Sequence, residues 1–114
     1  MESGGIRSYR DLEVWRRGMD FATEVYRLVK LMPKAEEYRL TAQVLRAAAS
    51  VPANIAEGHM RGSKKDYARF VSISRGSLAE AETFLMLAIR AGLLKAWVRS
   101  GEVNNGRVPF PRGQ

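Results

Sequence analysis

The sequence predicts an all-α protein, an up-down antiparallel helical bundle with three long helices. Three observations support this fold class. Apolar residues recur every three or four positions through three stretches, at roughly 9–31, 36–61 and 63–91. The connections between them, at 32–35 and 62–63, are short, and short connections place successive helices side by side and antiparallel. No competing signal for a β-strand is found along the chain.

The composition is that of one soluble domain. The chain has 114 residues, of which 46% are hydrophobic and 27% charged, and this suits a single hydrophobic core. It contains no cysteine, which excludes disulfides and thiolate metal sites and fits a reducing, cytoplasmic location. The N-terminal residues lack the apolar run of a signal peptide, and the longest apolar run, FLMLAI at 84–89, is too short to cross a bilayer. We therefore expect a cytoplasmic protein that does not enter a membrane.

The first predicted helix spans roughly 9–31 and follows a flexible N-terminus at 1–8. One apolar stripe along it consists of Leu12, Trp15, Met19, Ala22, Tyr26 and Val29. A second stripe beside it consists of Val14, Gly18, Phe21, Val25, Leu28 and Met32. Glu13 and Arg17 are spaced four apart on the opposite face and can form an ion pair. Pro33 ends the helix.

The second predicted helix begins near Glu36 and Glu37, because acidic residues favour the first turn of a helix. It runs to about Arg61, and Gly58 and Gly62 are candidates for its C-terminal end. Its inner stripe consists of Leu40, Val44, Ala47, Val51, Ile55 and Gly58.

The third predicted helix starts after Ser63, which is an N-cap residue with Asp66 three positions later, as in a capping box. Its inner stripe consists of Tyr67, Phe70, Ser74, Ser77, Ala81, Phe84, Ala88 and Ala91, with Val71, Leu78 and Leu85 in a parallel row. Gly92 either ends the helix or begins the turn after it. The bundle domain thus covers 9–94, and the Gly- and Pro-containing segment 95–114 is predicted to be an irregular tail, with room for a short helical turn around 96–99.

The stretch SVPANIAEG at 50–58 places a proline inside the second helix. Pro52 cannot donate a backbone hydrogen bond and its ring clashes with the carbonyl of Ala48, so a kink near 48–52 is expected. Asn54 and Glu57 follow on nearly the same face. Together they form a ligand site or half of an acid/base pair, or else an internal polar clasp that fixes the helix register.

The clasp is favoured because structural ion-pair networks commonly imitate functional sites. Its members are Arg46, Asn54, Glu57 and Ser77, with Ser74 and Arg75 as further candidate partners of the carboxylate. If Glu57 is buried and paired, its removal is expected to cost about 3 kcal/mol.

The net charge of +7 favours acidic partners, above all nucleic acid. Basic residues gather around the second connection: Arg61, Lys64, Lys65, Arg69 and Arg75. This cluster either contacts phosphates, with an affinity that falls as salt rises, or is a solvated helix end that keeps the protein soluble. No catalytic motif is recognised in the sequence. His59 is the single histidine, and GHMRGSKK has the wrong glycine spacing for a phosphate-binding loop. We expect no catalysis, no cofactor and no metal.

Three segments carry a family resemblance: YRDLEVWRRGMDFATEVY, YRLTAQVLRAAASVPANIAEG and DYARFVSISRGSLAEAETFLMLA. In this order they resemble the motifs of a four-helix bundle family that includes proteins encoded in intervening sequences of bacterial large-subunit ribosomal RNA genes. The family motif positions are Gln43, Arg46, Asn54, Glu57, Gly58, Arg75, Gly76, Ser77 and Glu80. Past a segment like AGLL at 91–94 the family continues into a leucine-rich fourth helix, which is absent or degenerate in this chain.

The family is similar to the accessory variability proteins of diversity-generating retroelements, which are basic homopentamers that associate with reverse transcriptase and nucleic acid. The resemblance therefore implies a non-enzymatic homo-oligomer, a pentamer by analogy, with RNA or DNA and reverse transcriptase as partners. The charge and the resemblance are consistent with two functions. The first is a self-assembling accessory factor that binds nucleic acid through the end of the bundle where helices two and three meet. The alternative is a structural or protein-docking scaffold without nucleic-acid binding, whose basic surface meets an acidic protein.

Overall fold

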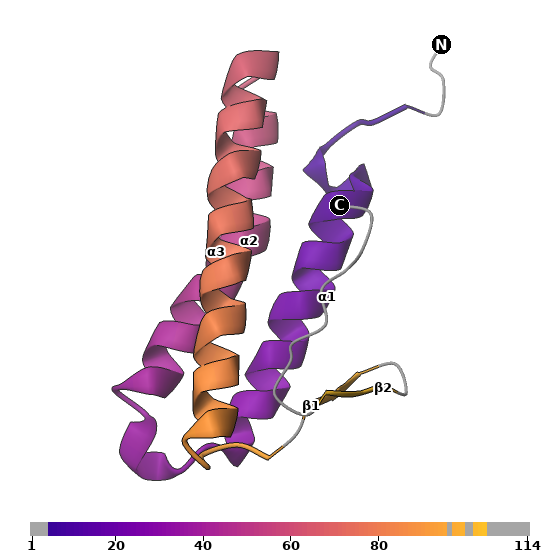
Figure 1. Cartoon of the computed structure of the whole chain (residues 1–114). Coiled ribbons are helices and arrows are strands. Elements are labelled where there is room, and N and C mark those ends of the chain that lie inside the picture. The colour runs from indigo at the N-terminus through magenta and orange to yellow at the C-terminus, as the bar shows by residue number, and fades with distance from the viewer. Residues whose placement is uncertain (1–4, 96, 100–101, 105–114) are drawn as a thin grey trace.

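The computed structural model describes residues 5–95, 97–99 and 102–104. Three long helices follow one another in alternating directions: α1 (Glu13–Leu28), α2 (Leu40–Met60) and α3 (Lys64–Arg90) (Figure 1). Helix α2 packs against both α1 and α3, whereas α1 and α3 make no comparable contact with each other. The predicted all-α bundle of three antiparallel helices is confirmed, with α2 as its central element.

The first predicted helix is divided into three pieces. A short 3-10 segment, η1 (Tyr9–Asp11), precedes α1, and another, η2 (Val29–Leu31), follows it. Leu12 lies between η1 and α1 in an extended conformation with ψ of 126°. The Asp11 carboxylate accepts hydrogen bonds from the backbone N–H groups of Arg7 and Ser8, and these bonds lower the pKa of Asp11. This local capping box turns the chain before α1 begins.

Helix α2 starts at Leu40, later than the acidic pair at 36 and 37 predicted. Residues Lys34–Glu36 form a 3-10 turn, η3, and Arg39 has φ −118° and ψ −109°, which is outside the helical region. The acidic residues therefore belong to the connection and not to the first turn of α2. At its other end α2 stops before Gly62, whose φ of +83° suits glycine, as predicted for this candidate.

Helix α3 is capped as the sequence predicts. The Ser63 hydroxyl accepts a hydrogen bond from the Asp66 N–H at 3.0 Å. A full capping box would also have the Ser63 N–H donate to the Asp66 carboxylate, and this second bond is not formed. The Asp66 carboxylate instead lies 4.0 Å from Nε of Arg69. Gly92, with φ +78°, follows the end of α3.

The core combines the inner stripe of α2 with one of the two stripes predicted for α1 and with Ala81, Leu85 and Ala88 of α3. Gly18, Phe21 and Val25 are buried, whereas Met19 and Tyr26 of the other stripe are 41% and 50% exposed. Because α1 has only α2 as a close neighbour, it buries one stripe and leaves part of the second uncovered.

Pro52 lies within α2, which continues from Leu40 to Met60 as one helix. Gly18 of α1 faces this point, and a Cβ there would lie 3.3 Å from a methyl group of Val51 and 3.4 Å from Cα of Pro52. From the other side, the Ser74 hydroxyl of α3 donates to the Val51 carbonyl at 2.8 Å. The stretch SVPANIAEG is therefore the place where both outer helices meet the central one.

Two short antiparallel strands follow the helices, β1 (Trp97–Arg99) and β2 (Glu102–Asn104), with Val98 opposite Val103. The helical turn suggested for 96–99 is therefore wrong. The signal for a hairpin was present, because Trp97, Val98 and Val103 favour strands and only Ser100 and Gly101 stand between the two runs. The other residues of the segment predicted as an irregular tail, 96, 100–101 and 105–114, lie outside the described residues, as do residues 1–4 of the predicted N-terminus.

Candidate nucleic-acid interface

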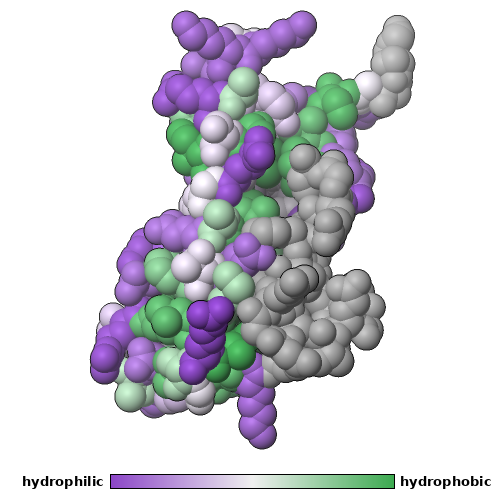
Figure 2. Space-filling view, in the orientation of Figure 1, coloured by the Kyte–Doolittle hydropathy of each residue, from purple (hydrophilic) through white to green (hydrophobic). Residues whose placement is uncertain are grey.

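The hairpin of α2 and α3 extends beyond the N-terminal end of α1 (Figure 1). Its turn carries four of the predicted cations, which we call the basic tip: Arg61, Lys64, Lys65 and Arg69. All four side chains are exposed. Figure 2 shows hydrophilic surface gathered at this end of the molecule. The fold thus presents the basic tip on a projection that a large partner can approach.

Two of the four cations are paired with carboxylates. Arg61 donates to Glu57 at 3.0 Å, and Nε of Arg69 lies 4.0 Å from Asp66. Lys64 and Lys65 have no ion pair within the part of the chain that the structure describes. Four cations thus face two carboxylates, so the net charge of the tip is about +2.

Both arginines of the tip lie on the ring of Phe70. Their guanidinium carbons are 4.9 Å (Arg61) and 4.6 Å (Arg69) from the ring centroid, which is within cation–π range. Phe70 in turn packs on Gly58 of α2, where a Cβ would lie only 2.7 Å from that of Phe70. This close contact sets the position of Phe70, and Phe70 sets the positions of the two guanidinium groups.

A shallow hollow lies at the turn itself, where α3 begins. Gly58, His59, Gly62, Ser63, Lys64 and Tyr67 line it. The His59 and Tyr67 rings meet edge to face with centroids 6.3 Å apart. Ser63 and Lys64, which line this hollow, stand at the N-terminal end of α3, so the positive end of the helix dipole adds to the local positive potential.

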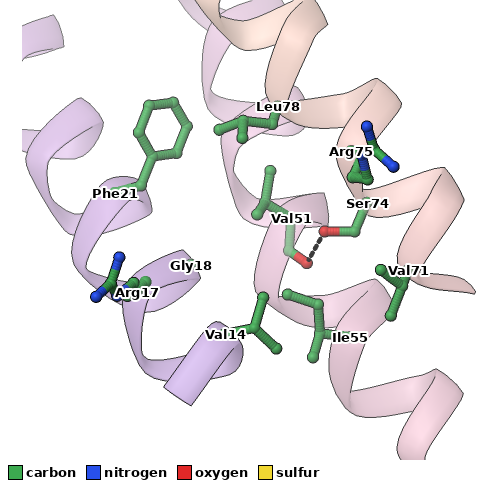
Figure 3. Close-up of a pocket in the computed structure, with 10 residues that line it drawn as sticks. All are labelled: Val14, Arg17, Gly18, Phe21, Val51, Ile55, Val71, Ser74, Arg75 and Leu78. Atoms are coloured by element: carbon green, nitrogen blue, oxygen red, sulfur yellow. Dashed lines mark hydrogen bonds between the residues drawn. The ribbon is translucent and has the colours of Figure 1, made fainter. Parts of the chain in front are cut away.

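The fifth predicted cation, Arg75, does not belong to the tip. It is six residues beyond Arg69 on α3, a rise of about 9 Å, and it lines a groove together with Arg17 and Val14 of α1 (Figure 3). The structure therefore separates the five cations into a cluster of four at the turn and one at the junction with α1.

The predicted polar clasp is wrong. Glu57 is exposed and pairs with Arg61 one turn away, while the Asn54 amide donates to the Ser50 carbonyl at 2.8 Å. Arg46 is exposed near Glu80 in a separate hollow, and Ser77 contacts neither Asn54 nor Glu57 through a hydrogen bond. Each polar side chain finds a partner or solvent on its own helix surface, so none has to be satisfied in the core.

An exposed pair such as Glu57 with Arg61 contributes at most about 1 kcal/mol. The larger penalty expected for a buried Glu57 therefore does not apply. The polar group that does link α2 and α3 is Ser74, buried with its hydroxyl on the Val51 carbonyl. From the sequence, Ser74 was a candidate partner of Glu57, and no pattern indicated Phe70 as the support for the tip arginines.

The chain matches the family model described as 23S rRNA-intervening sequence protein over residues 10–100. It belongs to that family. The match includes all three long helices and confirms the resemblance carried by the three motif segments. A search of the curated proteins finds no match to this chain.

The 23S rRNA-intervening sequence proteins are small helical proteins with no known catalytic role. In this member, the described residues contain no group of three or more histidine, cysteine or acidic side chains placed to hold a metal ion. Within the same part of the chain, no helix is both long and apolar enough to span a membrane.

Proposed function

We propose that this 23S rRNA-intervening sequence protein is a non-enzymatic bundle that binds nucleic acid through its basic tip. The observation that carries the proposal is the placement of Lys64 and Lys65. Both are exposed, neither has an ion pair among the described residues, and both lie in the first turn of α3 on a projecting hairpin. Two ammonium groups beside a helix N-terminus attract phosphate oxygens.

The ion pairs at the tip determine what kind of binding is expected. The charges of Arg61 and Arg69 are partly neutralised by the carboxylates of Glu57 and Asp66. Lys64 and Lys65 therefore supply most of the attraction for a phosphate backbone. The described residues of the tip form no recognisable element for entering a DNA groove, and contacts to phosphate carry no sequence information. Binding is therefore sequence-tolerant, modest in affinity and strongly dependent on salt. The total charge of +7 adds long-range attraction.

The double substitution Lys64→Glu with Lys65→Glu tests this proposal. We expect it to weaken binding to RNA or DNA on the order of 10- to 100-fold at low salt, because two phosphate contacts become repulsive. The loss should be similar for unrelated sequences. The slope of log K against log salt should flatten by about 1.4–1.8, the value for two lost contacts. Fluorescence anisotropy with two unrelated oligonucleotides across a salt series measures both quantities.

A matched control is Lys30→Glu with Lys34→Glu. These lysines are exposed and lie near the opposite end of the bundle. Their replacement by glutamate changes the total charge by the same amount as the double substitution at the tip. The control should retain most of the affinity. Equal losses in the two variants would show that only the total charge matters. No affinity of the unaltered chain for RNA or DNA at low salt would refute the proposal and favour the scaffold, whose basic surface meets an acidic protein.

Self-assembly is the second part of the proposal. Apolar side chains that the three helices leave exposed include Met19, Tyr26, Ile73 and Leu87, each between 41% and 51% exposed. Met19 and Tyr26 are seven residues apart, on the same stripe of α1, and exposed apolar side chains that share one surface commonly mark an interface between proteins. By the family resemblance, the assembly is a homopentamer, and its role is that of an accessory factor with reverse transcriptase as a partner.

Light scattering at micromolar protein concentration should give a mass several times the 12.8 kDa of one chain. The variant Met19→Lys with Tyr26→Lys should shift the mass towards that of the monomer, because it places two charges on the exposed stripe of α1. The variant Lys64→Glu with Lys65→Glu should leave the mass unchanged. A monomeric mass for the unaltered chain would contradict self-assembly without bearing on the basic tip.

A further inference from the structure

An apolar groove runs between α1 and α3, with α2 as its floor (Figure 3). It exists because α1 and α3 both pack on α2 and make little contact with each other. Six apolar side chains from the three helices line it: Val14, Phe21, Val51, Ile55, Val71 and Leu78. The groove is shallow, and the space within it that a water-sized sphere can occupy is about 70 Å³.

The floor of the groove offers no polar partner to a ligand. The buried hydroxyl of Ser74 already donates to the Val51 carbonyl at 2.8 Å. The side chains Val14, Val71 and Leu78 are only partly buried and form the accessible walls. An occupant therefore has to present apolar side chains to the groove.

The rim of the groove is basic on both sides. Arg17 stands on α1, and Arg75 stands across from it on α3 (Figure 3). Nε of Arg17 is 3.1 Å from Glu13, and Arg75 has neither a hydrogen bond nor an ion pair with any other described residue. Arg75 therefore favours a carboxylate beside the apolar stripe of an occupant, and Arg17, whose charge is partly neutralised by Glu13, favours a second one more weakly on the other side.

We propose that this groove binds an amphipathic α-helix of another protein, with acidic residues flanking its apolar stripe. Three helices already form three sides of the site, and a fourth helix laid along α1 and α3 would complete a four-helix arrangement. A second copy of this chain is a poorer occupant of this groove, because its 12 acidic residues against 19 lysines and arginines offer few carboxylates to the rim. The inference does not depend on nucleic-acid binding, which uses a different surface.

A synthetic helical peptide of about 18 residues, five turns, is long enough to test this groove. The acidic peptide has leucines at helical spacing with glutamates on both sides of the stripe, and the basic peptide has lysines in their place. We expect the acidic peptide to bind the full chain at least about tenfold more tightly than the basic one, as measured by fluorescence anisotropy. The variant Arg17→Glu with Arg75→Glu should reverse this preference, and Leu78→Glu should weaken the binding of both peptides.

Two controls separate the groove from general charge effects. Lys30→Glu with Lys34→Glu alters the total charge equally and should leave the preference within about twofold. Lys64→Glu with Lys65→Glu should also leave it unchanged, so the proposal survives even if the basic tip binds no nucleic acid. Circular dichroism should show that Arg17→Glu with Arg75→Glu retains the helices.

Three results would overturn the proposal. The first is that the acidic peptide does not bind the unaltered chain. The second is that both peptides bind equally, and the third is that the arginine variant keeps the original preference. If no peptide binds and Leu78→Glu instead dissociates a homo-oligomer into monomers, the groove is an interface between copies of this chain. The proposed partner helix is then wrong.

Discussion

Phe21→Ala is expected to lower the free energy of unfolding by about 3–5 kcal/mol. Phe21 is fully buried and is one of the largest side chains in the core, where α1 packs on α2. Its removal deletes the main apolar group of α1 and leaves a cavity that joins the open groove between α1 and α3. Since small domains are stable by only about 5–15 kcal/mol, this is a large share of the total. Urea denaturation followed by circular dichroism at 222 nm measures the change.

Leu31→Ala is a suitable control for this experiment. Leu31 is 73% exposed in the segment that follows α1, so its truncation should change the free energy of unfolding by no more than about 0.5 kcal/mol. If Phe21→Ala proved as mild as Leu31→Ala, α1 would not be packed on α2 through the stripe that contains Phe21.

Gly58→Ala should destabilise the protein by about 1–3 kcal/mol, although alanine is the better helix former. The added Cβ would lie 2.7 Å from Cβ of Phe70, which is closer than such atoms pack, and would also touch Cα of Tyr67 at 3.4 Å. Helices α2 and α3 would have to separate near the turn. Phe70 would then shift under the guanidinium groups of Arg61 and Arg69, so the basic tip should be disturbed as well. Thermal unfolding measures the first effect and oligonucleotide binding the second.

Gly76→Ala is the matched control, because it makes the same substitution in α3 where no atom lies within 4 Å of the added Cβ. It should stabilise the protein by up to about 1 kcal/mol through helix propensity alone. The two substitutions should therefore have opposite signs. Stabilisation by both would mean that α2 and α3 are not in close contact at Gly58.

The local parts of the candidate site could be predicted from the sequence because they depend on neighbours along the chain. Ser63 caps α3 through the Asp66 N–H, and Gly62 takes a positive φ, so the position of the turn follows from residue chemistry alone. The exposure of Lys64 and Lys65 follows as well, since both are off the apolar stripe of α3. Four of the five predicted cations therefore meet at one turn of the structure.

The ion-pair partner of Glu57 could not be predicted from neighbours along the chain. Its spacing from Asn54 suggested one shared polar contact, but a helix surface also offers Glu57 an arginine four residues later. Which partner it takes depends on where α3 passes, and α3 contacts the other side of α2, through Gly58. For the same reason the sequence grouped Arg75 with the tip, although in the structure Arg75 lies further along α3 and lines the groove between α1 and α3.

The sequence by itself determined three helices, their order, the inner stripe of α2 and the family of the protein, because helical periodicity, caps and motifs are properties of short segments. Only the tertiary structure decided which stripe of α1 is buried and that α1 and α3 stay apart. The physical reason is that burial depends on the number of neighbours a helix has. The central helix α2 has two and uses its whole apolar face, whereas α1 has one, buries the stripe with Phe21, and leaves Met19 and Tyr26 exposed.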